Sequence, residues 1–443
     1  MMQWNSATDR IVWMEEDERT YCAVEEPCRR MFSRVFYLKG AIMSKDIFDP
    51  IEEVIAAFRN GEIIVMTDDE DRENEGDLVC AAEAATPEAI NFMITHARGL
   101  VCVPMEEEML ARLGLSHMVP AHSSDKYHTA FMDSVDIRIG TTTGISATDR
   151  SNTARALIDE STVAGDFIKP GHMFPLKAMP GGTLERAGHT EGTVDLARIC
   201  GLKPAGVICE ILRENGEMAR VPELRKFANT HGLKMTAVSE IIKYRYTHEP
   251  LVHPDREVNM PTDAGLFRMT IYSSVVDNKD HLALVCGDAE SGKLPLVRMH
   301  SECLTGDVFH SRRCDCGAQL EAAMQAVQAH GYGAIVYMRQ EGRGIGLAKK
   351  IHAYELQDEG MDTVEANEHL GFNADLRDYG IGAQILADLN MKKIKLLTNN
   401  PAKIKGLDKY GIKVEERISL MLPSHEHNEK YLATKRDKLG HII

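Results

Sequence analysis

The sequence predicts two separate mixed α/β domains, with α+β character, joined by a short proline-containing linker and preceded by a poorly ordered N-terminal extension. The length of 443 residues exceeds what one hydrophobic core usually supports. Two series of apolar stretches alternate between strand-like and helix-like spacing. Between them, residues 247–262 contain three prolines and little apolar pattern. The chain therefore divides into an extension at 1–42, a first domain at 43–246, a linker at 247–260 and a second domain at 261–443.

The N-terminal extension carries no sustained periodicity, and a regular pattern begins at Met43. Both tryptophans, Trp4 and Trp13, lie in this segment. Residues 15–18 are all acidic, which disfavours a transit peptide. We expect residues 1–42 to be poorly ordered and to arise from an upstream start codon, with Met43 as the working start.

Composition excludes several classes of protein. A net charge of −16 disfavours general binding to nucleic acid or to anionic membranes, so we expect neither partner. Hydrophobic residues at 44% and charged residues at 27% are ordinary for folded domains. No apolar run approaches the roughly 20 residues that span a bilayer. Ten cysteines are too few for a disulfide scaffold, and without a secretory signal pattern we expect a cytoplasmic protein with reduced thiols.

The elements of the first domain follow from their spacing. Residues 51–60 have the period of an amphipathic helix closed by Gly61, and residues 62–66 resemble a short buried strand. The other expected elements are a helix at 87–97, a strand at 100–103, helices at 151–160 and 192–200, a strand at 206–212 and a helix at 222–231.

The second domain shows a similar alternation. The expected elements are strands at 267–272, 282–286 and 296–299, a helix at 318–330, a strand at 334–338, helices at 348–358 and 381–389, and a strand at 393–397. Strands that alternate with helices of this length indicate an α/β or α+β fold.

An acidic run follows the first predicted strand. Seven of the ten residues from Asp68 to Asp77 are acidic. Most such runs are solvated loops. This one leaves the end of an apolar strand, where active-site loops commonly lie. Carboxylates packed there repel one another unless a hard cation such as Mg²⁺ or Mn²⁺ is bound, so a metal site and a plain loop are both open.

Two further segments favour a functional site. Residues 169–175 set His172 between turn-forming residues, and residues 186–191 put Arg186, His189 and Thr190 at the expected start of a helix. Helix N–H groups, the Arg186 guanidinium and the Thr190 hydroxyl are able to bind a phosphate there. A lone histidine is more often structural than catalytic. Two of them, together with Glu210 at the end of an apolar strand, point to chemistry.

Five motifs resemble those of the 3,4-dihydroxy-2-butanone 4-phosphate synthase family, over about residues 45 to 245. They are Asp-Arg-Glu-Asn-Glu-Gly-Asp at 71–77, Thr-Thr-Gly-Ile-Ser-Ala at 142–147, Pro-Gly-His at 170–172, Gly-His-Thr-Glu at 188–191 and Lys-Pro-Ala-Gly-Val-Ile-Cys-Glu at 203–210. The resemblance implies conversion of ribulose 5-phosphate to 3,4-dihydroxy-2-butanone 4-phosphate and formate, with a divalent cation and no organic cofactor.

The same resemblance implies roles for individual residues. Glu73 and His189 would bind Mg²⁺ or Mn²⁺, and His172 and Glu210 would be the acid–base residues. The substrate would contact Arg72, Glu73, Asp77, Arg186, Ala187, Gly188, His189, Thr190 and Glu210. These residue types suit the reaction, because a metal polarises a ketose carbonyl while a histidine and a carboxylate move protons.

Three cysteines mark the second domain. Cys303, Cys314 and Cys316 follow a Cys-x10-Cys-x-Cys pattern, which indicates zinc in a cytosolic protein. With no obvious fourth ligand, one coordination position is open for water, as in catalytic zinc sites. Three unrelated core cysteines are the alternative. Downstream, a glycine-rich turn at 340–346 connects a strand to a helix and is able to wrap N–H groups around phosphate, although this signal alone is weak.

Further motifs resemble those of the GTP cyclohydrolase II family, over about residues 261–443. They are Arg-Met-His-Ser-Glu-Cys-Leu-Thr-Gly-Asp at 298–307, Cys-Asp-Cys-Gly at 314–317, Arg-Gln-Glu-Gly-Arg-Gly-Ile-Gly-Leu at 339–347, Asp-Thr-Val-Glu-Ala-Asn at 362–367, Leu-Thr-Asn-Asn-Pro at 397–401 and the terminal Lys-Leu-Gly-His at 438–441. The resemblance implies opening of the GTP imidazole ring, which yields formate, pyrophosphate and 2,5-diamino-6-ribosylamino-pyrimidinone 5'-phosphate.

This second resemblance also implies residue roles. Cys303, Cys314 and Cys316 would bind Zn²⁺, with Mg²⁺ accompanying GTP. Asp375 would accept a proton, Arg377 would attack phosphorus, and Tyr354 would lie near the guanine. The GTP site would comprise Arg298, Met299, His300, Ser301, Glu302, Gln319, Glu341, Gly342, Arg343, Thr363, Thr398 and Lys403. Arginine is hard to deprotonate, so the sequence by itself suggests charge stabilisation for Arg377.

Together the two resemblances imply a bifunctional enzyme that supplies both precursors of riboflavin from ribulose 5-phosphate and GTP. Both families are typically homodimeric, so we expect a homodimer or a higher homo-oligomer. Two alternatives compete with this prediction. In one, a single half is catalytic and the other is a scaffold. In the other, the chain is a zinc-dependent nucleotide-sensing regulator, which would not need two metal sites.

Overall fold

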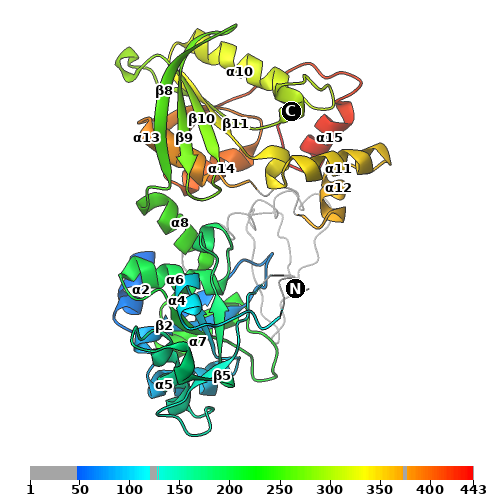
Figure 1. Cartoon of the computed structure of the whole chain (residues 1–443). Coiled ribbons are helices and arrows are strands. Elements are labelled where there is room, and N and C mark those ends of the chain that lie inside the picture. Colours follow the sequence, from blue (N-terminus) through cyan, green and yellow to red (C-terminus); the bar gives the residue numbers. More distant parts are fainter. Residues whose placement is uncertain (1–46, 120–126, 128, 373–376, 443) are drawn as a thin grey trace, which may run out of the picture.

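The computed structural model describes residues 47–119, 127, 129–372 and 377–442. The predicted extension at 1–42 and the predicted proton acceptor Asp375 lie outside these residues. Figure 1 shows two units, one with strands β1 to β7 and one with strands β8 to β14, and helix α8 (Val238–His248) between them. This arrangement confirms the prediction of two mixed α/β domains.

The first unit is built on a seven-stranded mixed sheet with the order β4-β5-β3-β6-β2-β1-β7. Its strands are β1 (Ile64–Thr67), β2 (Gly76–Ala81), β3 (Cys102–Met105), β4 (Val135–Ile137), β5 (Phe167–Lys177), β6 (Gly206–Glu210) and β7 (Met235–Ala237). Its helices besides α8 are α2 (Ile51–Arg59), α3 (Pro87–Phe92), α4 (Glu107–Arg112), α5 (Ala147–Leu157), α6 (His189–Cys200) and α7 (Val221–His231).

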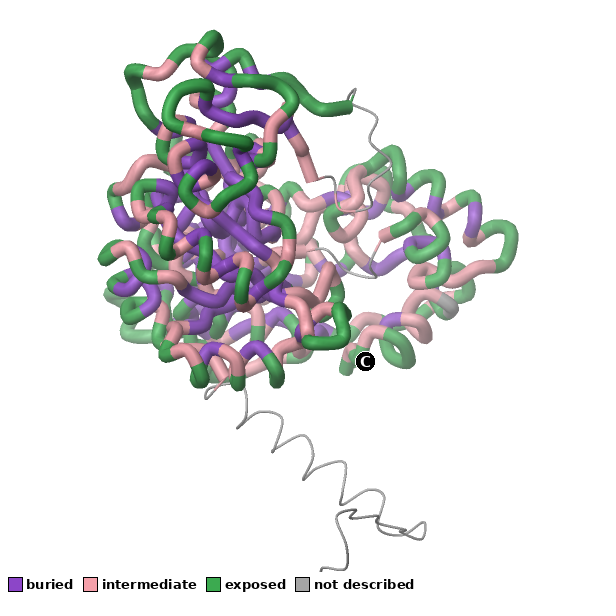
Figure 2. The backbone as a smooth tube through the Cα atoms, turned by 90° about the horizontal axis from the view of Figure 1, so that it is seen from below, coloured by how far each residue is buried: buried purple, intermediate pink, exposed green. Residues whose placement is uncertain are grey.

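Helices cover both faces of this sheet. Alternate strand residues such as Val79, Cys102 and Ile208 form one core with helices α2, α6 and α8. The residues between them, such as Val103 and Cys209, form the other core with helices α3, α5 and α7. Figure 2 shows buried segments through the interior and exposed segments in the outer loops. The result is a three-layer α/β/α arrangement, in which α6 lies over the face that carries the site described below.

The second unit is built on another seven-stranded mixed sheet, with the order β14-β13-β11-β12-β10-β9-β8. Its strands are β8 (Val252–Thr262), β9 (Gly265–Ser274), β10 (Asp280–Cys286), β11 (Leu296–Ser301), β12 (Gly333–Met338), β13 (Lys393–Leu397) and β14 (Lys413–Ile418). Its helices are α9 (Leu304–Asp307), α10 (Cys316–His330), α11 (Leu347–Asp358), α12 (Thr363–His369), α13 (Gly380–Asp388), α14 (Pro401–Lys409) and α15 (Glu429–Asp437). Strands β11 to β14 pair in parallel, so their carboxyl ends meet at one edge.

The segment predicted as a linker, 247–260, differs from that prediction. It contains the last two residues of α8 and most of strand β8, which pairs antiparallel with β9. The prolines Pro254 and Pro261 are compatible with a strand because β8 lies at the edge of the sheet, where a missing N–H breaks no ladder. Hence the two units are joined by only a short turn.

Helix α8, which the sequence patterns did not predict, ties the units together. Tyr246 on this helix belongs to the core of the second unit. Gln384 of α13 donates hydrogen bonds of 2.8 Å to the carbonyl oxygens of Tyr246 and Glu249 and accepts one of 2.9 Å from the N–H of Leu251. The units therefore pack against each other. No helix in the described ranges is long and apolar enough to cross a membrane.

Candidate functional sites

The acidic loop between β1 and β2 is organised by Asp68. Its buried carboxylate accepts hydrogen bonds from the N–H groups of Glu73 (3.0 Å) and Glu75 (2.8 Å) and from Arg72 Nη1 (2.9 Å). These three hydrogen bonds fold the loop back onto the end of the strand, so part of the acidic run is ordered and is not a solvated loop. The sequence patterns did not single out Asp68 for this role.

A cluster of ligand atoms forms where this loop meets the start of helix α6. One ligand atom each from Asp68, Glu73 and His189 lies within 4.8 Å of the others. His189 Nδ1 is 3.7 Å from Glu73 Oε2, while its Nε2 is buried and has no hydrogen-bond partner among the described residues. An unpartnered buried imidazole nitrogen among carboxylates matches the donor set of a divalent cation.

The charges of this cluster depend on one another. Burial is the main reason that the pKa of Asp77 is raised to about 7; the charge of His189 opposes this rise, and the carboxylates of Glu210 and Glu73 add to it. Burial opposes protonation of His189, but Asp77, Glu73 and Asp68 together raise its pKa to about 9. Negative charge is thus concentrated in a buried place, which is where a cation is stabilised.

The sheet aligns the acid–base candidates in one row. Asp77 of β2 pairs directly with Glu210 of β6. Cys102 of β3 pairs with Ile208 on one side and with Phe174 on the other. Glu210 lies two residues after Ile208 and His172 two residues before Phe174. Because β6 runs antiparallel to β3 and β5 runs parallel to it, both steps lead toward the same end of the sheet. Since side chains two apart share a face, the acid–base candidates His172 and Glu210 and the predicted substrate contact Asp77 all lie on the face covered by α6. At about 4.8 Å per strand, His172 and Glu210 are about 10 Å apart at their Cα atoms.

His172 is held by Asp136, a residue that sequence reasoning missed. The Nδ1 of His172 is 2.7 Å from Asp136 Oδ2, and its backbone N–H donates to Oδ1 at 2.9 Å. The segment expected as a turn is part of strand β5, next to a bulge in its pairing with β4. With 44% of its side chain exposed, His172 keeps its other nitrogen available to a ligand. Nothing in the local sequence signals a partner 36 residues away.

The Thr-Thr-Gly motif forms a turn against this pair. Asp149 of α5 accepts hydrogen bonds from Thr142 and from the N–H of Gly144. The hydroxyl and N–H of Thr142 lower the pKa of Asp149 to about 2. Gly144 has φ +90°, and a Cβ there would lie 2.1 Å from Asp136 Oδ2. Glycine is required at this position, because the His172–Asp136 pair occupies the space that a side chain would fill.

The predicted phosphate contacts converge before helix α6. A Cβ on Gly188 would lie 2.6 Å from Arg186 Nη1 and 3.0 Å from Arg72 Nη2, so both guanidinium groups reach this point. Arg186 also donates to Glu191 Oε2 at 2.6 Å and to the carbonyl oxygen of Tyr127 at 3.0 Å. Ala187, Gly188 and the buried Thr190 lie beside them at the helix start. Arginines next to the free N–H groups of a helix terminus suit a phosphate.

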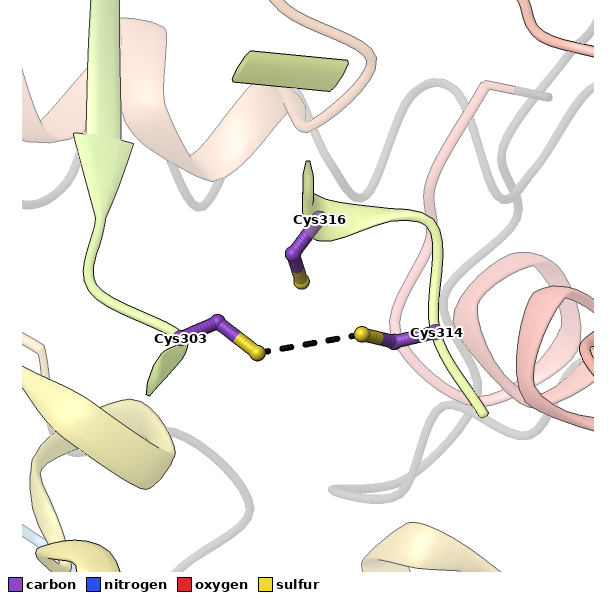
Figure 3. Close-up of side chains that lie close together, drawn as sticks. All are labelled: Cys303, Cys314 and Cys316. Atoms are coloured by element: carbon purple, nitrogen blue, oxygen red, sulfur yellow. Dashed lines mark hydrogen bonds between the residues drawn. The ribbon is translucent and has the colours of Figure 1, made fainter. Parts of the chain in front are cut away.

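The three cysteines of the second domain come together as predicted from their spacing. Figure 3 shows their side chains pointing toward one another, with Cys303 after strand β11 and Cys316 at the start of α10. The three Sγ atoms lie within 4.8 Å of one another, and Cys303 Sγ is 3.7 Å from Cys314 Sγ. A Cβ on Gly306 would lie only 3.0 Å and 3.1 Å from two of the sulfurs, so this glycine leaves room for the cluster.

The charge of the cluster is set by its surroundings. Hydrogen bonds from Cys314 and Cys316, and then the charge of Lys350, lower the pKa of Cys303 well below its usual range. Lys350 Nζ lies 3.1 Å from Cys303 Sγ and 2.8 Å from Glu341 Oε1. A thiolate beside two further thiols in a compact, cation-stabilised cluster is the donor set that Zn²⁺ prefers.

A cavity opens beside the cysteines at the carboxyl ends of the parallel strands β11, β12 and β13, with about 1100 Å³ of empty space including the part open to solvent. Ligands of open α/β sheets bind at this edge. The predicted residues that line it are Arg298, His300, Ser301, Glu302, Gln319, Glu341, Gly342, Arg343, Tyr354, Thr363, Arg377, Thr398 and Lys403. Lining residues that the sequence patterns did not identify include Arg313, Lys350, Tyr431 and Lys435, and His441 of the terminal motif lines the cavity although no role was predicted for it.

One predicted GTP residue lies on the other face of its strand. The side chain of Met299 is buried in the core, where a Cβ on Gly382 would meet its Cε. Its carbonyl oxygen accepts a hydrogen bond of 2.7 Å from Lys403 Nζ, so Met299 contributes through its backbone. Arg377 Nη1 is 3.4 Å from Ser301 Oγ at the edge of the cavity. In the turn after β12, Gly342 and Arg343 both have left-handed φ, of +62° and +61°.

Comparisons with known proteins agree with this geometry. The model of the 3,4-dihydroxy-2-butanone 4-phosphate synthase family matches residues 52–244, and that of the GTP cyclohydrolase II family matches residues 253–419. The "Riboflavin biosynthesis protein RibBA" of Bacillus subtilis is 57% identical over 398 residues, which cover 90% of this chain and all of the relative. Its counterpart in Bacillus mycoides is 55% identical over 397 residues, with the same coverage.

A solved structure is similar over most of the chain. RibBX from A. baumannii, described as a two-domain 3,4-dihydroxy-2-butanone 4-phosphate synthase, superposes with a TM-score of 0.65 at 36% identity. The match covers 85% of this chain and 100% of that one.

Proposed function

Because the chain belongs to the family of bifunctional riboflavin biosynthesis proteins, we propose specific roles for the residues of its two sites. The chain is a bifunctional enzyme, with a lyase domain, 3,4-dihydroxy-2-butanone 4-phosphate synthase, followed by a hydrolase domain, GTP cyclohydrolase II. The first acts on ribulose 5-phosphate and the second on GTP, and each reaction releases formate.

In the synthase half, Glu73 and His189 hold Mg²⁺ or Mn²⁺. The unpartnered Nε2 of His189 next to Glu73 and Asp68 is the observation that carries this assignment. A bound divalent cation supplies polarisation of the ketose oxygens. Arg72 and Asp77 contact the substrate hydroxyls, while Arg186 and the start of α6, including Thr190, bind its phosphate.

The proton transfers of the synthase are assigned to His172 and Glu210. Asp136 accepts from Nδ1 of His172, which leaves Nε2 with a lone pair to take a proton from the substrate. Glu210 accepts the N–H of Leu100 on one oxygen at 2.7 Å and keeps the other for proton exchange. Their Cα atoms, about 10 Å apart on one face, leave room for a sugar phosphate between them.

In the cyclohydrolase half, Cys303, Cys314 and Cys316 hold Zn²⁺, which supplies activation of water for attack on the purine. Arg298, Arg343 and Lys403 bind the triphosphate, together with Mg²⁺ that arrives with GTP. Tyr354 lies by the base. Asp375 as proton acceptor and Arg377 as the group that attacks phosphorus stay predictions from the family resemblance.

The main competing interpretation is that only one half is catalytic. The A. baumannii relative is described by its synthase activity alone, although it also has two domains. In this chain the three gathered thiols and seven described cationic side chains around the cavity support cyclohydrolase activity in the second half. A regulator that only senses nucleotides would not need a zinc donor set beside its pocket.

Metal analysis tests the two metal assignments. Purified protein is expected to contain one zinc per chain and to lose it in Cys314→Ser, whereas His189→Ala is expected to retain zinc and to lose Mg²⁺-dependent synthase activity. Zinc content that is unchanged in Cys314→Ser would contradict the assignment. We further propose that the enzyme works in the cytoplasm as a homodimer or larger homo-oligomer, for which light scattering of the purified protein is the test.

A further inference from the structure

The segment after strand β14 reaches back to the GTP cavity. The match to the GTP cyclohydrolase II family ends at residue 419, so helix α15 and residues 438–442 lie beyond it. Nevertheless Tyr431, Lys435 and His441 from this segment line the same cavity as the three cysteines. None of these three side chains has a role in the site assigned above.

Several contacts fix this C-terminal segment in place. Lys438 forms ion pairs with Asp362 and Glu365 at the start of α12. The N–H of Ile442 donates to the carbonyl oxygen of Asn399, at the carboxyl end of β13, at 2.8 Å. The segment is therefore tied to two separate elements of the cavity wall, on either side of His441.

A third contact joins the segment to the metal cluster. The buried Lys435 Nζ lies 2.6 Å from Oδ1 of Asp315, the residue between the zinc ligands Cys314 and Cys316. Asp315 Oδ2 accepts from Gln319 Nε2 at 2.6 Å, and Gln319 in turn accepts from Arg298. Lys435 thus helps to position Gln319 and Arg298 of the GTP site through Asp315. Because its ammonium group is already paired with Asp315, it is not the group in this segment that lacks a partner.

His441 differs from Lys435, because it lies among positively charged side chains that would attract an anionic ligand. Burial and then the charges of Lys435, Arg343, Arg377 and Lys403 hold its pKa down at about 4. Its Nδ1 is buried and has no hydrogen-bond partner among the described residues. The imidazole is thus a neutral polar group in a ring of cations, with a nitrogen that lacks a partner. An oligophosphate at this point would pair with the cations and accept the imidazole N–H.

We propose that His441, held in place by the C-terminal segment, binds the triphosphate of GTP. This inference rests on the proposed location of the GTP site. It assigns a phosphate-binding residue beyond residue 419, where the match to the GTP cyclohydrolase II family model ends. It also gives roles to two residues of the terminal Lys-Leu-Gly-His motif: Lys438 anchors the segment and His441 contacts the ligand.

The test compares the zinc-loaded full-length enzyme with His441→Ala. The probes are GTP as substrate and inorganic tripolyphosphate and guanosine as competitive inhibitors. A lost hydrogen bond to a charged group at a half-exposed position is expected to raise the KM for GTP and the Ki of tripolyphosphate about tenfold. The Ki of guanosine is expected to stay unchanged, because guanosine has no phosphate.

Three further variants separate the possible causes. His441→Gln retains an N–H donor and should restore most of the tripolyphosphate affinity. His427→Ala removes a 54% exposed imidazole from the same segment and should behave as wild type. Lys438→Met breaks the anchor and should reproduce part of the His441→Ala defect. The zinc content of each variant and its Ki for guanosine report that the second domain is folded.

The outcomes distinguish this inference from the proposed function. An equal Ki of tripolyphosphate in wild type and His441→Ala would overturn the role of His441 while GTP turnover by wild type continues. A guanosine Ki raised as much as that of tripolyphosphate would overturn it as well, because the defect would then concern the whole pocket. If wild type neither turned over GTP nor bound tripolyphosphate, the proposed GTP site itself would be wrong.

Discussion

Replacing Gly144 by alanine is predicted to disable the synthase through the His172–Asp136 pair. The new Cβ would lie 2.1 Å from Asp136 Oδ2 and 2.5 Å from His172 Nδ1. A carbon and an oxygen in contact keep about 3.3 Å between them, so the carboxylate must retreat by about 1 Å. A misplacement of that size at a catalytic group costs about 100-fold in rate.

Gly140 offers a matched control four residues earlier. Its φ of +87° equals that of Gly144 (+90°) within a few degrees, but the nearest atom to its added Cβ is Asn152 Nδ2 at 3.7 Å. Alanine at either position pays the same backbone cost of about 1–2 kcal/mol. Both variants should therefore show a fall in melting temperature, while only Gly144→Ala meets the proposed acid–base residue His172 and its partner Asp136.

The assay is the rate of formate release from ribulose 5-phosphate at saturating Mg²⁺. We expect kcat to fall about 100-fold in Gly144→Ala and to stay near wild type in Gly140→Ala. Equal kcat values for the two variants would refute the reasoning, since of the two added Cβ atoms only that at position 144 meets His172 and Asp136.

Three further predictions follow from other parts of the described chain. Gly306→Ala should lower zinc occupancy and cyclohydrolase activity, because the new Cβ would lie 3.0 Å and 3.1 Å from two of the cysteine sulfurs. Zinc analysis after dialysis checks this prediction, and full zinc occupancy would contradict it. Because burial and four cations lower the folded-state pKa of His441 to about 4 while the unfolded value is about 6.5, the unfolded chain binds more protons between these values. Stability should thus be lost as the pH falls from 6.5 towards 4, and His441→Asn should show a flatter melting temperature over that range. Tyr246→Ala should destabilise the second domain by about 3–5 kcal/mol, because the ring fills space against Gly380 and packs 4.8 Å from the ring of Tyr410. Tyr246→Phe keeps the ring and loses only the hydrogen bond to Asp378, so its cost should be smaller. A calorimetric transition unmoved by the alanine variant would oppose this.

The sequence predicts those features that depend on local pattern. The Cys-x10-Cys-x-Cys spacing brings Cys303, Cys314 and Cys316 to one point because a short helix and a loop close the distance between a strand end and a helix start. The acidic run lies at the end of β1 as predicted, since the chain becomes polar where it leaves a buried apolar strand for the loop at the edge of the sheet. The alternation of strand and helix periods likewise predicts the fold class of both domains.

Features that depend on distant contacts could not be predicted in this way. Asp136 and His172 meet only because β4 and β5 pair, and no local pattern fixes that pairing. Strand β8 was interpreted as a linker because proline usually disfavours strands, whereas the edge position that tolerates Pro254 is a property of the whole sheet. Lys435 and His441 reach the cavity because the chain turns back after β14, and although the motif that contains His441 was recognised, local spacing does not show where it lies in the fold.

The central claim is that one chain carries two independent active sites, and paired formate assays on a single preparation test it most directly. Wild type should release formate from GTP and, separately, from ribulose 5-phosphate. Cys314→Ser should abolish only the first activity and Glu210→Ala only the second. The claim would be contradicted if either substitution silenced both reactions, or if wild type released formate from only one of the two substrates.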